Sequence, residues 1–256
     1  MKFDVSLIPD DVKDGEHSVC ILIDVLRASS TITTLMNKGC GEILLTDNIE
    51  AALESGELMS ADDIVSCSEG VEGNCRNGAD FSPSLIGIEK MPDFDEKRIL
   101  MQTTNGTTAI HKLYQKGGGK ILIGCMRNAS AVMEKAVEIA EELSFDINVV
   151  CAGREGSTIY TIDDLYCAAR LIEYGVKAAG RRSIQWFLND SAKIALHSLK
   201  VYGSAEEAFA ASASGNVMRS IHCDEDILLC AQDSIMETVP YINREASSNY
   251  IVVRTR

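Results

Sequence analysis

Short apolar runs that alternate with helical patterns constrain the fold of this 256-residue chain more than any other feature. Strands that are apolar along their whole length are buried on both faces, as in parallel sheets covered by helices. A helical pattern after each strand indicates crossover units between parallel strands. The predicted strands cover residues 18–24, 42–46, 99–102, 120–124 and 146–152.

Helical segments follow these strands, and further helices fill the last third of the chain. The predicted fold class is therefore α/β, a three-layer α/β/α arrangement with a mainly parallel sheet and a helical C-terminal region covering it. We assign residues 250–254 to an edge strand, and residues 70–92 to a long loop rich in Gly, Asn, Ser and Pro. The predicted helices cover residues 27–38, 48–55, 104–114, 128–143, 161–178, 189–202, 205–213 and 224–238.

The length of the chain fits one large domain or two small ones. We interpret residues 1–256 as a single unit, because no linker interrupts the pattern. The alternative is a division into two α/β subdomains with a boundary near residues 115–180.

The net charge of -14 limits the classes of partner that the chain can bind. An acidic surface repels nucleic acid and anionic lipid, so we expect neither nucleic acid nor a membrane as a partner. Nine cysteines without a CxxC pair, and an N-terminus that opens as a strand, predict reduced thiols and a cytoplasmic location. An anionic small molecule remains compatible, because arginines, backbone N–H groups and a divalent cation can invert the local potential.

The first turn with candidate chemistry follows the strand at residues 18–24. Asp24 ends this strand, where a carboxylate can reach a metal ion or a reacting group. Arg27 offers a planar donor fork for an anion. Ser29 and Ser30 lie where the next helix begins, so their hydroxyls can bind an oxyanion or cap the helix. The alternative is a capped helix with a surface ion pair between Asp24 and Arg27.

The second turn follows the strand at residues 99–102. Gly106 permits a close approach of the backbone to a ligand. Exposed N–H groups and threonine hydroxyls together make a suitable phosphate cradle. The alternative is an Asn-Gly turn with threonine caps, although a helix follows here and not a hairpin partner strand. The turn consists of Thr103, Thr104, Asn105, Gly106, Thr107 and Thr108.

The third turn follows the strand at residues 146–152 and contains Arg154. Asp163 and Asp164 open the next helix. Two adjacent carboxylates can hold Mg²⁺, which prefers hard oxygen ligands, or they can complement the helix macrodipole. Glu69, in a glycine-rich stretch, is either a further metal ligand over the site or a solvated loop charge.

Four sequence strings occur in a fixed order along the chain: IDVLRASSTITT, TTNGTTAI, CAG and DDLYCAA. Together they resemble the 2-phosphosulfolactate phosphatase family over roughly residues 1–175. The resemblance implies Mg²⁺-dependent hydrolysis of (R)-2-phospho-3-sulfolactate to 3-sulfolactate and phosphate, a step of coenzyme M biosynthesis in methanogens. The implied partner is therefore a small phosphorylated acid.

Two departures from the family pattern concern arginines. Glu69 follows Ser68 and precedes Gly70 where the family has an arginine-bearing segment, and Thr108 stands where an arginine commonly follows the NGT string. Two expected anion-binding groups are therefore replaced, which leaves a related 2-phospho acid open as the substrate. Arg154 is a candidate to compensate.

The resulting hypothesis assigns a role to each candidate residue. We expect catalytic roles for Asp24, Arg27 and Asn105, metal binding by Asp24, Asp163, Asp164 and Glu69, and substrate binding by Ser29, Ser30, Thr103, Thr104, Gly106, Thr107 and Arg154. Whether a water molecule or a carboxylate attacks phosphorus stays open.

Two rival interpretations remain at this point. An isochorismatase-like cysteine hydrolase would use Cys125 or Cys151 as the nucleophile. A non-catalytic module would bind a phosphorylated metabolite at the same turns without hydrolysing it. For the assembly, the base rate among soluble oligomers favours a homodimer.

Overall fold

The computed structural model describes residues 1–54, 64–68, 75, 78–103, 105–243 and 250–255. Its described strands form one ten-stranded sheet. The strands are β1 (Lys2–Ser6), β2 (Ser18–Ile23), β3 (Glu42–Thr46), β4 (Ile64–Cys67), β5 (Arg98–Gln102), β6 (Lys120–Gly124), β7 (Asp146–Cys151), β8 (Phe187–Leu188), β9 (Pro240–Asn243) and β10 (Ile251–Thr255).

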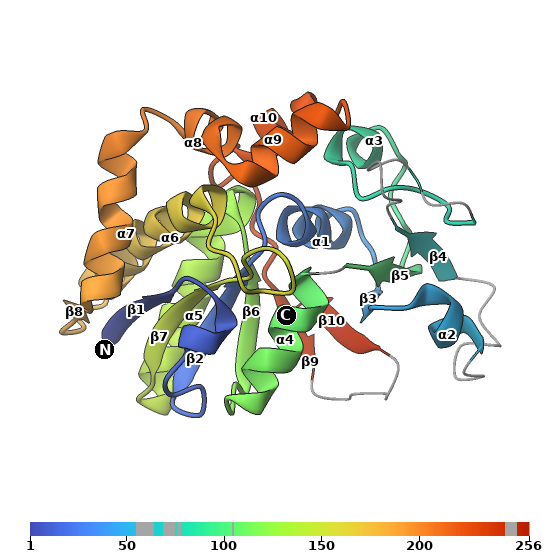
Figure 1. Ribbon diagram of the computed structural model, residues 1–256. Helices are drawn as coiled ribbons and strands as arrows, with labels where there is room; N and C mark the ends of the chain where they lie inside the picture. The colour runs from blue at the N-terminus through green and yellow to red at the C-terminus, as the bar shows by residue number, and fades with distance from the viewer. Residues whose placement is uncertain (55–63, 69–74, 76–77, 104, 244–249, 256) are drawn as a thin grey trace.

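Helices cover both faces of this sheet, which confirms the predicted three-layer α/β class. The described helices are α1 (Ala28–Asn37), α2 (Ile49–Glu54), α3 (Leu85–Glu89), α4 (Asn105–Gln115), α5 (Ala129–Leu143), α6 (Ile162–Arg181), α7 (Asp190–Val201), α8 (Ala205–Ala211), α9 (Ala213–Ser220) and α10 (Asp224–Cys230), with short 3-10 turns at η1 (Pro9–Asp11) and η2 (Met126–Asn128). Figure 1 shows α8, α9 and α10 as one group above α6 and α1, with α3 beside α10.

The strand order is β4-β5-β3-β10-β9-β6-β2-β7-β1-β8. Strands β4, β5 and β3 form one parallel block, and β6, β2, β7, β1 and β8 form a second. The antiparallel strands β10 and β9 join the two blocks. Parallel strands therefore dominate, and one continuous sheet runs through both halves of the chain.

The register of β2 with its neighbours places three strand ends side by side. Ile23 at the end of β2 pairs with Gly124 of β6 and with Cys151 of β7. The N–H of Ala152 also donates to the carbonyl oxygen of Ile23 at 2.7 Å. The turns that follow β2 and β7 therefore leave the sheet together, as ligand sites at the carboxyl ends of parallel strands require.

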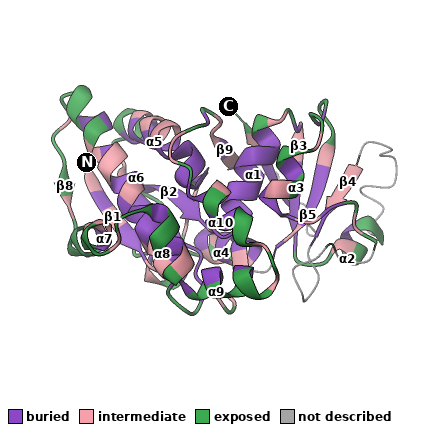
Figure 2. Ribbon diagram, turned by 90° about the horizontal axis from the view of Figure 1, so that it is seen from above, coloured by how far each residue is buried: buried purple, intermediate pink, exposed green. Residues whose placement is uncertain are grey.

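Strand β2 is buried on both faces because two hydrophobic cores meet it. Ile21 and Ile23 belong to the core that α5 and α6 cover. Cys20 and Leu22 point to the opposite face and belong to the core that α1 and α4 cover. The uninterrupted apolar sequence of this strand is thus explained by its position in the middle layer. Figure 2 shows buried residues along β1, β2 and α1, and exposed residues on α7 and α9.

Two of the predicted elements are wrong in placement or length. Residues 250–254 were expected at a sheet edge, but β10 lies inside the sheet, between β3 and β9. The helix expected at 224–238 ends at Cys230. The backbone N–H groups of Ser234 and Met236 instead donate to the carbonyl oxygens of Met126 and Arg127, so tertiary contacts replace helical hydrogen bonds in this segment.

The sequence pattern also left several elements undetected. Strand β9 begins at Pro240 and has only four residues, and α3 has five, so neither shows a usable period. Strand β4 and α3 lie within or beside the segment that was expected to be a loop. No described helix is both long enough and apolar enough to cross a membrane.

Candidate active site

The turns after β2 and β7 and the start of α4 meet around one hollow of about 160 Å³. Asp24 comes from the first turn, Asn105 from the start of α4, and Arg154 from the turn after β7. The beginning of α6 and one side of α9 complete the wall. The lining residues are Asp24, Leu26, Asn105, Gly153, Arg154, Thr161, Asp163, Asp164, Ser214, Val217 and Met218.

Asp164 is fixed at the base of this hollow by two backbone donors. The N–H of Val25 donates to Oδ1 at 3.0 Å, and the N–H of Gly153 donates to Oδ2 at 3.2 Å. Burial raises the pKa of Asp164 well above its usual range, and the negative charges of Asp163 and Asp24 act in the same direction. Asp164 therefore ties the β2 and β7 turns together and places a third carboxyl group beside the other two.

Asp163, unlike Asp164, has a carboxylate oxygen that could still accept a ligand. It is buried, and its Oδ1 has no hydrogen-bond partner among the described residues. Burial raises its pKa, while its own backbone N–H and the hydroxyls of Ser214 and Ser212 lower it. A buried carboxylate oxygen without a donor is costly, so a ligand that supplies positive charge would be stabilised here.

Asp163→Asn should therefore raise the melting temperature of the metal-free protein at pH 7.5. The folded-state pKa of Asp163 lies above its usual value of 3.8, so ionising this group destabilises the fold as the pH rises from about 4. We expect a gain of roughly 2–4 °C, the shift that about 1 kcal/mol gives at this chain length. Thermal melts of both proteins at pH 4 and pH 7.5 check this. A gain that is equal at the two pH values, or a loss at pH 7.5, contradicts the assignment.

A second hollow of about 120 Å³ adjoins the first. Asp24, Leu26 and Asn105 line both hollows and therefore stand between them. The end of β5 and the start of α1 form its other walls. The lining residues are Asp24, Leu26, Arg27, Ala28, Pro83, Met101, Gln102, Thr103 and Asn105.

The start of α4 approaches Asp24 closely because residue 106 is glycine. A Cβ at Gly106 would lie 3.0 Å from Thr103 Oγ1 and 3.6 Å from Asp24 Oδ2. The amide oxygen of Asn105 accepts a hydrogen bond from the N–H of Gly156 at 3.3 Å, which joins the second and third turns. Backbone N–H groups at the start of this helix therefore lie near the carboxylate cluster, where they favour an anion.

Thr103 and Thr107 bind each other at the start of α4. Their hydroxyl oxygens are 3.1 Å apart, and the N–H of Thr107 donates to Thr103 Oγ1 at 3.0 Å. Thr103 lines the second hollow, whereas Thr107 lines neither. The predicted substrate contact of Thr104 lies outside the described residues, as does the predicted metal ligand Glu69.

The hydroxyls of Ser29 and Ser30 form hydrogen bonds with backbone groups of the first turn. The N–H of Asp24 donates to Ser29 Oγ at 3.1 Å, and Ser30 Oγ donates to the carbonyl oxygen of Val25 at 2.9 Å. Both side chains are buried, and neither lines one of the two hollows. These hydroxyls hold Asp24 in place by closing the turn.

Arg27 borders the second hollow, and its guanidinium forms a buried ion pair with a residue that does not line the hollow. Its Nη1 donates to Asp226 Oδ2 at 2.7 Å, and the two side chains are only 2% and 0% exposed. This pair could not be predicted from the sequence, since Asp226 lies 199 residues away in an acidic helix start. Ser212 and Ser214 were missed for the same reason.

Mg²⁺ binding can be judged from the oxygen groups that are present. Within the described residues, no three carboxylate, imidazole or thiol side chains stand close enough together to hold a metal ion. Mg²⁺, however, needs only one or two carboxylates when waters and substrate phosphate complete its shell. Asp24 and Asp163 line the same hollow, and no described residue donates a hydrogen bond to the buried Oδ1 of Asp163. The donor set therefore fits a magnesium ion held partly by substrate.

The cysteines proposed for the rival hydrolase lack the properties of a nucleophile. Cys125 is 0% exposed and Cys151 is 1% exposed. Burial raises the pKa of both thiols, and for Cys151 the negative charges of Asp164 and Asp163 raise it further. A reactive cysteine needs an accessible thiolate, so the geometry disfavours the cysteine-hydrolase interpretation.

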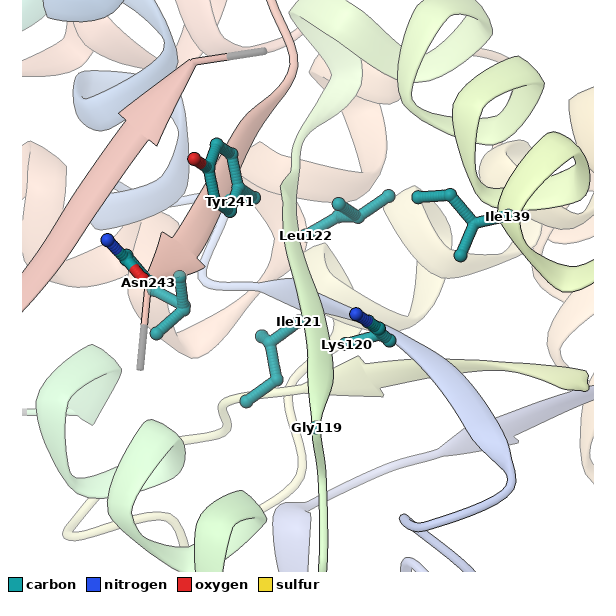
Figure 3. Close-up of a pocket in the computed structure, with 8 residues that line it drawn as sticks. Gly119, Lys120, Ile121, Leu122, Ile139, Tyr241 and Asn243 are labelled. Atoms are coloured by element: carbon teal, nitrogen blue, oxygen red, sulfur yellow. The ribbon is translucent and has the colours of Figure 1, made fainter. Parts of the chain in front are cut away.

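Two larger hollows lie away from the three turns. One, of about 230 Å³, lies beside the amino-terminal half of β6 and is lined by Lys120, Leu122, Tyr241 and their neighbours (Figure 3). The other, of about 410 Å³, lies over α6 beside Arg170 and Asp233, which are paired with each other at 2.6 Å. Neither hollow contains a predicted site residue, so size alone does not locate the site.

Comparison with known proteins identifies the family. The family described as 2-phosphosulpholactate phosphatase matches residues 6–245. A Deinococcus radiodurans protein is 32% identical over 94% of this chain and 92% of its own length, and a Clostridium botulinum protein is 32% identical over 94% and 96%. A Thermus thermophilus protein is 28% identical over 95% and 98%. All three carry the name "Probable 2-phosphosulfolactate phosphatase". The chain therefore belongs to the 2-phosphosulfolactate phosphatase family.

Proposed function

We propose that this protein is a Mg²⁺-dependent phosphatase that hydrolyses 2-phospho-3-sulfolactate, or a related 2-phospho acid, to the 2-hydroxy acid and phosphate. The observation that carries the proposal is the meeting of Asp24, Asp163 and Asp164 with the start of α4 at two adjoining hollows. The family and the names of the relatives support the same reaction class. In this proposal the reaction serves coenzyme M biosynthesis and takes place in the cytoplasm.

Asp24 and Asp163 would hold the metal ion, with Asp164 fixing the turn that carries them. Bound Mg²⁺ offsets the negative charge that develops on the phosphoryl oxygens. Both backbone donors to Asp164 come from turns that line the site, so Asp164 positions its neighbours even where it does not bind the ion. Glu69 stays a predicted additional ligand.

The phosphoryl group would bind in the second hollow. It would be oriented there by Arg27, Asn105, Thr103 and the first N–H groups of α4. Phosphoryl transfer depends mainly on such positioning and on electrostatic stabilisation. In the overall reaction, the oxygen of one water molecule becomes bonded to phosphorus while the ester oxygen–phosphorus bond breaks, and a proton from that water ends on the leaving oxygen. Ser29, Ser30 and Thr107 support this arrangement by holding the two turns.

The sulfonate of 2-phosphosulfolactate is assigned to the first hollow. Arg154 lines it and supplies a cation, and Ser214 adds a hydroxyl. Val217 and Met218 give the same hollow an apolar wall, which suits the short carbon chain of a 2-phospho acid. Arg154 would thereby supply the positive charge that the family's arginines near Glu69 and at Thr108 supply in other members.

The experiment that tests the function compares substrates. Purified protein with Mg²⁺ should release phosphate from 2-phosphosulfolactate with a kcat/KM at least about tenfold above those for phospholactate and phosphoglycolate, because only the former places a sulfonate beside Arg154. Preference for another 2-phospho acid keeps the phosphatase and rejects the sulfonate substrate.

Release from none of these compounds rejects the proposed activity. A ligand-induced rise in melting temperature without phosphate release then selects the non-catalytic binding module. If hydrolysis is observed, its loss with iodoacetamide but not with EDTA selects the cysteine hydrolase. Light scattering of the same sample tests the expected homodimer.

A further inference from the structure

We propose that Asp226 is a positioning residue of this site, which acts by holding Arg27 in the orientation that binds the phosphoryl group. This inference rests on the proposed function, in which Arg27 borders the phosphoryl hollow. It extends the site to α10, a helix that lines neither hollow.

The Asp226 carboxylate is fully buried and has a separate task for each oxygen. Oδ2 accepts the hydrogen bond from Arg27 Nη1 at 2.7 Å. Oδ1 accepts from Ser84 Oγ at 3.1 Å and from the N–H of Ile86 at 3.0 Å. The two donors from the start of α3 fix the plane of the carboxylate, so the direction from which it receives Arg27 is fixed as well.

Arg27 is correspondingly restrained. Its side chain is only 2% exposed, yet it is one of the residues that line the second hollow. A guanidinium has five N–H donors in a rigid fork, so fixing one end determines where the rest of the fork points. A buried charge–charge hydrogen bond of this kind costs desolvation and is weak support for stability, which makes a role in orientation the better explanation.

The pair also joins parts of the chain that are far apart. Arg27 precedes α1, Ser84 and Ile86 belong to α3 and its start, and Asp226 lies in α10. The C-terminal helices would therefore not only cover the sheet but also control one wall of the phosphoryl hollow.

The test measures binding of inorganic phosphate by calorimetry in the presence of Mg²⁺, beside kcat and KM. Asp226→Asn keeps the size of the side chain and removes its charge. We expect the Kd for phosphate to rise about tenfold or more, because Arg27 loses its charge-assisted anchor. Asp233→Asn is the matched control, since it removes the carboxylate from another Arg–Asp pair, with Arg170, away from both hollows. It should change the Kd by less than roughly twofold.

A double-mutant cycle separates positioning from a structural role. In an Arg27→Met background, Asp226→Asn should change the Kd for phosphate by less than roughly twofold, because a positioning residue has nothing left to position. Asp226→Glu keeps the charge and displaces it by one methylene group, so it should weaken phosphate binding, while its melting temperature should fall less than that of Asp226→Asn, which removes the buried charge beside Arg27. This variant also serves if Asp226→Asn does not fold.

Unchanged phosphate affinity in both Asp226 variants overturns the inference. Equal effects of Asp226→Asn with and without Arg27 overturn it too. Absence of phosphate binding by the unsubstituted protein counts against it in the same way. Because the titration needs no substrate, failure to hydrolyse any phospho acid would reject the proposed function while the titration still decides the role of Asp226.

Discussion

Replacement of Asp24 by Asn should lower phosphate release by about 10³-fold while leaving the fold intact. Asp24 lines both hollows and lies beside the start of α4, so in the proposed function it borders both the metal site and the phosphoryl site. Charge stabilisation by a bound metal supplies several kcal/mol, and each ~1.4 kcal/mol corresponds to a tenfold change in rate. The measurement is kcat for the best substrate at saturating Mg²⁺, beside a thermal melt.

Asp10→Asn is the matched control for this prediction. Asp10 pairs with Lys112 at 2.8 Å on the surface, and its side chain is 52% exposed. Surface pairs of this kind contribute little to stability, so we expect no measurable change in kcat. Near-normal turnover in Asp24→Asn would contradict the catalytic and metal-binding roles proposed for this residue.

The second large effect is expected at Gly153. Gly153 and Gly156 have the same φ of +68°, in the left-handed region where a side chain is strained. A Cβ on Gly153 would lie 2.6 Å from the carbonyl oxygen of Ile159, whereas a Cβ on Gly156 would meet nothing within 4 Å. Gly156→Ala should therefore cost only the strain of about 1 kcal/mol, and Gly153→Ala about 2–4 kcal/mol.

Activity should follow the same order. The N–H of Gly153 donates to Asp164, so displacement of this backbone disturbs the carboxylate cluster. We expect kcat to fall about 100-fold in Gly153→Ala, and less in Gly156→Ala. Urea unfolding and steady-state kinetics of the two variants check both parts. Equal losses of stability in the two alanine variants would contradict the prediction, because the close contact at Gly153 would then not lower the free energy of unfolding.

The central strands and the strand-end turns of the candidate site were predictable because both depend on local patterns. The uninterrupted apolar sequence of β2 indicates burial on both faces, and the structure places helices on both. Asp24 follows β2 and Asp163 lies in the first turn of α6, and the type of both elements was clear from the sequence pattern. The carboxyl ends of parallel strands face the same edge, so the sequence placed all three turns at that edge, whereas the pairing of β2 with β7 is known only from the structure.

The rest depended on contacts between distant segments. Strand β10 carries the short, apolar sequence expected of many strands, but only its pairing with β3 and β9 shows that it is internal. The partner of Arg27 could not be read from the sequence, since Asp226 has the same local signature as any acidic residue in a first helical turn. Single residues recruited by tertiary packing, such as Ser214, leave no periodic signal.

The dependence of phosphate release on Mg²⁺ tests the central claim most directly. Protein treated with EDTA and then dialysed should release no phosphate from 2-phosphosulfolactate or its analogues, and Mg²⁺ should restore release in the unsubstituted protein but not in Asp163→Asn. This result would support a magnesium site formed by the carboxylates of the first and third turns. Full activity after removal of divalent ions, or equal restoration in Asp163→Asn, would contradict it.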